Sequence, residues 1–143
     1  MTAPHLPSRT TCSALVIACS DFRVQSVERE FFERAGLRDD YDLIARPGSI
    51  RSLVAPRNEA ARTSMEEEIS ILHRIHAFER VVMINHASCR AYDDIATTAN
   101  ELDLHADHLE QAATRIRELL GGVKPETFIA IPDGNAFKLN ATA

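Results

Sequence analysis

Residues 13–19 read Ser-Ala-Leu-Val-Ile-Ala-Cys, and residues 80–84 read Arg-Val-Val-Met-Ile. Both stretches are short and almost continuously apolar, which is typical of strands buried on both faces of a parallel sheet. Two further stretches, residues 41–45 (Tyr-Asp-Leu-Ile-Ala) and 127–131 (Thr-Phe-Ile-Ala-Ile), predict strands for the same reason. Four buried strands therefore form the framework from which the rest of the chain can be interpreted.

Helical patterns separate these strands. Apolar residues recur at helical spacing over residues 26–35, 58–77 and 104–120, and glycine follows the first and the last of these stretches. The turn-forming residues 132–135 (Pro-Asp-Gly-Asn) predict a return into a short fifth strand over residues 137–139. Alternating strands and helices predict right-handed βαβ units. We therefore expect an α/β fold with a mainly parallel sheet of four to five strands and helices on both faces.

Length and composition narrow the class of protein. The 143 residues are enough for one packed core, so we expect residues 1–143 to form a single domain. The 45% hydrophobic and 26% charged residues are typical of a globular protein, and a formal charge of −5 argues against a nucleic-acid binder. No apolar run approaches the ~20 residues of a membrane helix. Three cysteines are an odd number, so we expect no disulfide framework and a cytoplasmic location.

Metal-ligating side chains follow two of the predicted strands. Cys19 ends the strand over residues 13–19, while His86 and Cys89 follow the strand over residues 80–84. Each group alone is a weak signal, since a lone buried cysteine is more often a small core residue. The carboxyl ends of parallel strands meet at one rim, where ligands collect. Zinc favours thiolate and imidazole ligands, and three protein ligands leave one position for chemistry. The joint placement therefore predicts one zinc ion per chain.

Two charged residues lie beside Cys19. In an extended segment, Asp21 and Arg23 would point to the same side as Cys19. Asp21 could instead cap a helix, and Arg23 could be a surface charge. A carboxylate that lies beside a metal and is held by a guanidinium group is the functional interpretation.

These motifs resemble those of a known family. Residues 19–23 (Cys-Ser-Asp-Phe-Arg) resemble the Cys-x-Asp-x-Arg motif of the β-class carbonic anhydrases, and residues 86–89 (His-Ala-Ser-Cys) resemble their His-x-x-Cys motif. The similarity extends from about residue 13 to residue 139. It implies a β-carbonic anhydrase-like fold that forms a homodimer or a multiple of dimers, with zinc held by Cys19, His86 and Cys89.

The resemblance also implies an activity. It predicts a zinc lyase that reversibly hydrates carbon dioxide to bicarbonate through a zinc-bound hydroxide, with Asp21 and Arg23 as a catalytic dyad that gates the metal. Two thiolates make zinc a weaker Lewis acid than three histidines do, so we expect activity to rise on the alkaline side.

The sequence departs from the family pattern on both sides of the second motif, and also at the turn over residues 46–49 (Arg-Pro-Gly-Ser). Asn85 and Arg90 stand where the family usually has glycine on either side of its second motif. Arg90 could narrow the pocket, bind an anion or face solvent. Two alternatives therefore stay open, namely the same zinc fold acting on another small linear substrate such as carbon disulfide, and a non-catalytic zinc-binding relative. A cysteine enzyme with Cys89 as nucleophile would leave Cys19 without a role.

Four of the other histidines and the third cysteine are interpreted as structural residues. His105 and His108, and likewise His73 and His76, are three residues apart on predicted helices, which is typical of a polar helix face. A role for His105 and His108 in proton transfer is the less favoured alternative. Cys12 precedes the first predicted strand and is interpreted as a packed residue.

Overall fold

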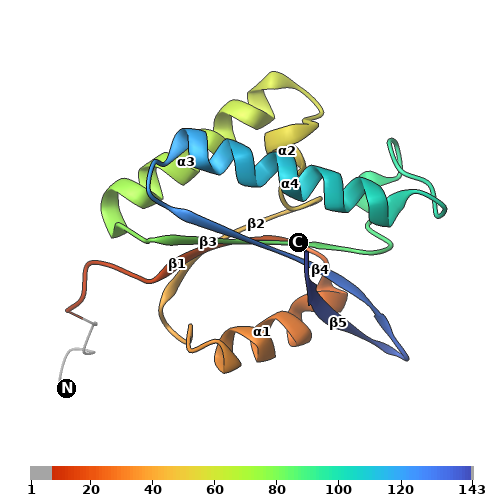
Figure 1. Cartoon of the computed structure of the whole chain (residues 1–143), viewed down its shortest axis with the longest axis horizontal. Helices are drawn as coiled ribbons and strands as arrows, with labels where there is room; N and C mark the ends of the chain where they lie inside the picture. Colours follow the sequence, from red (N-terminus) through yellow and green to blue (C-terminus); the bar gives the residue numbers. More distant parts are fainter. Residues whose placement is uncertain (1–7, 143) are drawn as a thin grey trace, which may run out of the picture.

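The five strands form one sheet in the order β2-β1-β3-β4-β5, as the computed structural model of residues 8–142 shows (Figure 1). The strands are Ala14–Cys19 (β1), Tyr41–Arg46 (β2), Arg80–His86 (β3), Lys124–Asp133 (β4) and Ala136–Ala141 (β5). The four helices are Gln25–Arg34 (α1), Arg51–Val54 (α2), Glu59–His76 (α3) and Glu101–Leu119 (α4). β1 to β4 are parallel and β5 is antiparallel to β4.

The predicted fold class is confirmed. Each predicted strand is present, although β4 begins at Lys124, three residues before the predicted start. α1 covers one face of the sheet, and α2, α3 and α4 cover the other (Figure 1). The short helix α2 was not predicted, because Pro56 interrupts any helical pattern around it. Among the described residues, no helix is both long and apolar enough to cross a membrane.

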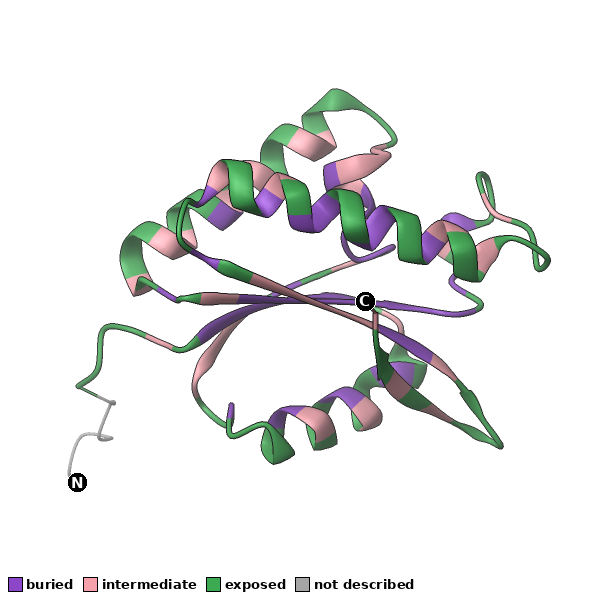
Figure 2. Cartoon of the chain, viewed as in Figure 1, coloured by how far each residue is buried: buried purple, intermediate pink, exposed green. Residues whose placement is uncertain are grey.

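Two apolar layers hold the sheet between the helices. The larger layer lies beneath α2, α3 and α4 and includes Leu15, Ile17 and Met83. The smaller layer lies against α1 and includes Val16 and Phe32. Alternate residues of β1 thus enter opposite layers, and all six residues of this strand are buried (Figure 2). This explains why β1 reads as a continuous apolar run.

The sheet register brings the two predicted motifs together. β1 and β3 are neighbouring parallel strands, paired from Ala14 with Arg80 to Ala18 with Ile84. Cys19 is the last residue of β1 and His86 is the last residue of β3. The last side chains of both strands therefore lie at the same carboxyl edge of the sheet.

Candidate metal centre

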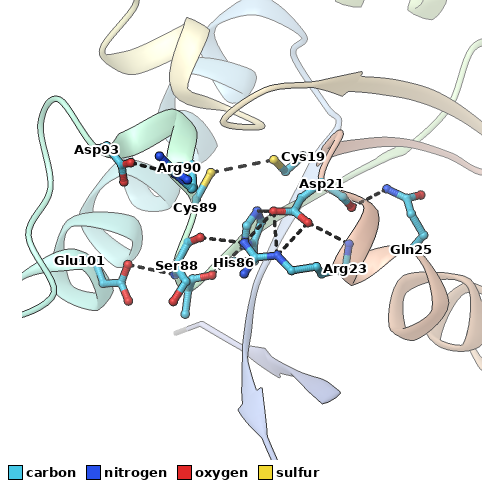
Figure 3. Close-up of polar contacts among 11 residues, drawn as sticks. Cys19, Asp21, Arg23, Gln25, His86, Ser88, Cys89, Arg90, Asp93 and Glu101 are labelled. Atoms are coloured by element: carbon cyan, nitrogen blue, oxygen red, sulfur yellow. Dashed lines mark hydrogen bonds and ion pairs between the residues drawn. The ribbon is translucent and has the colours of Figure 1, made fainter. Parts of the chain in front are cut away.

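The structure brings together the three side chains that the sequence predicts as zinc ligands. The ligand atoms of Cys19, His86 and Cys89 all lie within 4.8 Å of one another, and the two Sγ atoms are 3.9 Å apart (Figure 3). Their exposed fractions are 4%, 1% and 5%. Three donors of the types that zinc prefers thus converge in an environment shielded from water.

His86 presents an unpaired nitrogen within this cluster. Its Nδ1 lies 2.8 Å from the carbonyl oxygen of Ala87, to which an Nδ1–H donates. That tautomer leaves Nε2 as an acceptor, and this buried atom has no hydrogen-bond partner among residues 8–142. Leaving a buried polar atom unpaired costs about 1–3 kcal/mol. A metal ion would remove this penalty, so the residues fit a zinc ion.

The pKa values of the three side chains in the cluster also favour the binding of a cation. A hydrogen bond from the Cys89 thiol, aided by His86, lowers the pKa of Cys19 to about 4 despite burial. The same contact, together with burial, raises the pKa of Cys89. Burial lowers the pKa of His86, but the contacts with Cys19 and with the Ala87 carbonyl oxygen, together with the negative charges of Cys19 and Asp21, raise the pKa overall. A divalent cation can displace these protons and take up the negative charge of both sulfur atoms.

Asp21 and Arg23 form a forked ion pair beside the cluster (Figure 3). Arg23 Nε donates to both carboxylate oxygens at 3.1 and 3.2 Å, and Nη2 donates to Oδ2 at 2.7 Å. Asp21 Oδ2 also lies 3.7 Å from His86 Nε2. The hydrogen bonds from Arg23 lower the pKa of Asp21 to about 2, so this carboxylate stays ionised at neutral pH.

The dyad is anchored to both motifs. Arg23 Nη2 donates to the carbonyl oxygen of Ser88 at 2.8 Å, and the guanidinium carbon lies 5.9 Å from the ring centre of Phe137 on β5. Asp21 also accepts a hydrogen bond from the backbone N–H of Arg23 at 2.8 Å, which caps the 3-10 turn Phe22–Val24. The helix-cap and ion-pair interpretations of Asp21 therefore both describe its contacts.

An open pocket of about 590 Å³ borders this buried cluster. Residues 19–23, Pro47 and residues 89–91 line it. The Arg90 side chain is 89% exposed and its Nε donates to Asp93 at 3.2 Å. Arg90 therefore faces solvent, which is one of the three roles that the sequence allows for it.

Comparison with known proteins agrees with this geometry. A family model described as putative carbonic anhydrase matches residues 9–128. The chain belongs to this putative carbonic anhydrase family. An uncharacterized protein of Rickettsia bellii (strain RML369-C) is 29% identical over 136 residues, which cover 91% of this chain and 83% of that protein.

Solved structures show the same fold at low identity. The carbonic anhydrase of Streptococcus mutans aligns with a TM-score of 0.63 and 13% identity, covering 99% of this chain and 88% of the other. The β-carbonic anhydrase isoform I of Trichomonas vaginalis gives 0.60 and 11%, covering 99% and 87%. An apo carbon disulfide hydrolase gives 0.60 and 11%, covering 93% and 79%. The chain is thus a divergent, β-carbonic anhydrase-like member of its family.

In this family member, a turn and a buried arginine fix the loops around the cluster. Gly48 has a φ of +83°, and its backbone helps lower the pKa of the Cys19 thiol. A Cβ atom at Gly48 would lie 3.2 Å from the Cβ of Arg51. Arg51 is 5% exposed; it donates to both carboxylate oxygens of Asp94 at 2.6 and 2.8 Å and to Ala91 O at 2.6 Å. Arg51 therefore fastens the loop after Cys89, and no local sequence signal indicates this role.

The prediction that His105 and His108 lie on a polar helix face is wrong. Both are buried, with exposed fractions of 1% and 7%. Asn85 Nδ2 donates to His105 Nδ1 at 3.0 Å and to Tyr92 Oη at 3.3 Å, and Tyr92 Oη lies 3.0 Å from His108 Nδ1. Burial lowers the pKa of His105 to about 4, so it is neutral at physiological pH. In this member of the putative carbonic anhydrase family, Asn85 thus joins a buried polar network directly beside the candidate ligand His86.

Proposed function

We propose that this family member is a zinc-dependent lyase that reversibly hydrates carbon dioxide to bicarbonate, with one zinc ion per chain held by Cys19, His86 and Cys89. The observation that carries this proposal is the buried Nε2 of His86, which has no hydrogen-bond partner among residues 8–142, in a cluster with two free cysteines. A zinc ion held there would act as a Lewis acid and lower the pKa of bound water towards neutrality.

Asp21 and Arg23 are the side chains that would act on the substrate water beside the metal. Arg23 keeps Asp21 ionised and holds it in a fork of hydrogen bonds, so the carboxylate lies beside the ligand cluster but is already engaged by the guanidinium group. Asp21 remains a hydrogen-bond acceptor at the pocket, where it can orient the attacking water. The hydrogen bond from Arg23 to Ser88 holds this arrangement against the loop that carries Cys89. Release of Asp21 from Arg23 would let the carboxylate compete for the metal, which is the gating role.

The pocket suits a small substrate that carries no charge. Phe22, Pro47 and Ala91 contribute apolar side chains to its wall next to Cys19 and Cys89. Carbon dioxide and carbon disulfide share a linear, apolar form, and one of the structures with the same fold is a carbon disulfide hydrolase. Both molecules should therefore be offered to the protein in parallel.

Zinc content and rate, measured on the same preparation, test the proposal. We expect about one zinc per chain at the carboxyl edge and stopped-flow hydration of carbon dioxide that increases on the alkaline side. Hydrolysis of carbon disulfide without hydration of carbon dioxide would show that carbon disulfide is the substrate. A zinc-loaded protein that acts on neither molecule over a broad pH range would be the non-catalytic relative.

We also propose that the chain forms a homodimer or a multiple of dimers in the cytoplasm. β2 is an edge strand of the sheet and carries Leu43, which is 54% exposed. An uncovered strand edge with an apolar side chain favours association. Light scattering should give at least twice the mass of the chain, and a stable monomer at micromolar concentration would contradict this proposal.

A further inference from the structure

A second group of metal-ligating side chains lies at the amino edge of the sheet, at the other end of β1 from the metal centre. Cys12 lies two residues before β1, Asp42 is the second residue of β2, and His76 is the last residue of α3. Their ligand atoms all lie within 4.8 Å of one another. Cys19 follows Cys12 by seven positions of extended chain, which span roughly 20 Å, so one ion cannot bind to both groups.

The backbone fixes where these three side chains lie. The N–H of Cys12 donates to the carbonyl oxygen of His76 at 3.1 Å, which ties the segment before β1 to the end of α3. Asp42 shares a side of β2 with Ile44, which belongs to the apolar layer beneath α2, α3 and α4. Asp42 therefore faces the layer that contains α3. Three separate elements thus converge through main-chain contacts and sheet alternation.

The donor set suits a borderline-soft divalent cation. His76 Nδ1 lies 2.7 and 2.9 Å from the two carboxylate oxygens of Asp42, and the thiol of Cys12 completes the group. Thiolate, imidazole and carboxylate are the three ligand types that zinc uses in proteins, and water can supply a fourth. His76 also ends an 18-residue helix, whose negative end favours a cation.

The surroundings allow an ion to enter. The side chains of His76 and Asp42 are 38% and 17% exposed, in contrast to the buried cluster at the carboxyl edge. The two arginines that line the neighbouring pocket are already paired, Arg9 with Asp40 at 3.2 Å and Arg80 with Glu126 at 2.8 Å. Their positive charges are thus largely neutralised, so they oppose a bound cation only weakly.

A catalytic cysteine is a poorer interpretation of the same residues. Burial and the negative charge of Asp42 raise the pKa of the Cys12 thiol. Nucleophilic cysteines show the opposite shift, because a neighbouring positive charge stabilises their thiolate. A carboxylate close to both the thiol and the imidazole can instead act as the third ligand of a shared cation.

We propose that Cys12, Asp42 and His76 form a second binding site for a divalent transition-metal ion, Zn²⁺ being the ion that best matches the ligands. A bound ion would fasten the segment before β1 to β2 and to the end of α3. This site is independent of the proposed hydration chemistry, because it uses none of the residues at the carboxyl edge.

The test compares zinc content among variants of the full chain. Each protein is dialysed against micromolar Zn²⁺ and analysed for zinc per chain. We expect two zinc ions in the parent and one in Cys12→Ala, Asp42→Asn or His76→Gln. His73→Gln is the matched control, since His73 lies one turn earlier on α3 and packs on Phe78 instead of the cluster; it should retain both ions.

X-ray absorption at the zinc edge provides a second measurement. The carboxyl-edge ion has two sulfur ligands and the amino-edge ion has one, so the average number of sulfur scatterers per zinc should rise in Cys12→Ala. Thermal unfolding checks that each variant folds. If Cys12→Ala or His76→Gln does not fold, Asp42→Asn serves as the test, because it keeps the shape of the side chain. The proposal is overturned if none of the three substitutions lowers the zinc content below that of the parent, or if the ion that they remove binds only at millimolar Zn²⁺. A parent that holds one zinc, lost on these substitutions, would instead contradict the metal assignment at the carboxyl edge.

Discussion

The two edges of the sheet each gather three metal-ligating side chains, but in opposite surroundings. At the carboxyl edge, His86 is 1% exposed and its Nε2 has no partner within residues 8–142. At the amino edge, His76 is 38% exposed and already contacts the carboxylate of Asp42. A buried unpaired imidazole depends on an ion, whereas a half-exposed, paired imidazole is stable without one. Metal loss should therefore affect the carboxyl edge far more than the amino edge.

The largest expected effect comes from removing one sulfur ligand at the carboxyl edge. Cys89→Ser should lose the zinc of that edge, become less stable, and lower carbon dioxide hydration by roughly 10³-fold or more, because Lewis-acid chemistry is gone. Elemental analysis and stopped-flow assays measure both quantities. The paired change Cys12→Ser should leave the carboxyl-edge zinc in place, and full zinc retention in Cys89→Ser would contradict the ligand assignment.

The next effect concerns the pair of Asp21 and Arg23 at the carboxyl edge. Arg23→Ala should free Asp21 to bind the metal, so hydration should fall by roughly 100-fold while zinc content stays near that of the parent. Asp21→Asn should share the kinetic defect but leave the coordination open, because an amide cannot close the site as an anion. X-ray absorption at the zinc edge distinguishes the two variants.

Arg34→Ala is the control for the dyad, since Arg34 is an exposed residue in the last turn of α1. It should hydrate carbon dioxide like the parent. Parent-like hydration by Arg23→Ala would instead show that Arg23 is a surface charge, and the gating role would be wrong.

The smallest of the three effects is on the pH dependence of stability and concerns the buried polar network behind the carboxyl edge. The ordinary pKa of 6.5 for His105 falls to about 4 in the folded chain, which corresponds to about 3 kcal/mol. The unfolded chain therefore takes up this proton first, so the stability is fully present above pH 6.5 and is lost as pH falls towards 4. In chelator-treated protein, His105→Gln should show a smaller loss of unfolding free energy between pH 7.5 and 4.5 than the parent.

Urea unfolding at several pH values measures this difference. His73→Gln serves as the control, because His73 lies outside the network and is partly exposed. Equal pH dependence in the parent and in His105→Gln would show that His105 does not control acid stability.

Sequence reasoning located the fold and the first cluster because both depend on local patterns. β1 and β3 are buried on both faces, so their apolar runs are unambiguous, and Cys19 and His86 directly end them. Sheet order then brings these two ends together without further information.

The features that sequence reasoning missed depend on contacts between distant segments. His105 on α4 is buried and contacts Tyr92 and Asn85, and a pair of histidines on a helix gives no sign of such partners. Cys12, Asp42 and His76 converge from three elements, so their spacing along the chain forms no motif. The unusual Asn85 beside His86 was the one visible signal of the buried network.

The 3.9 Å between the sulfur atoms of Cys19 and Cys89 has a consequence for oxidative damage. Without a metal, an oxidant needs to bring these atoms only to about 2.05 Å to join them covalently. That bond would remove two zinc ligands and also cross-link positions 70 residues apart, which stabilises a folded chain by about 4 kcal/mol. Peroxide should therefore convert the chelated protein, but not the zinc-loaded protein, into a more stable form that cannot take up zinc until a reductant is added. Intact-mass analysis and zinc uptake before and after reduction measure this, and equal sensitivity of both forms would show that zinc does not protect the pair.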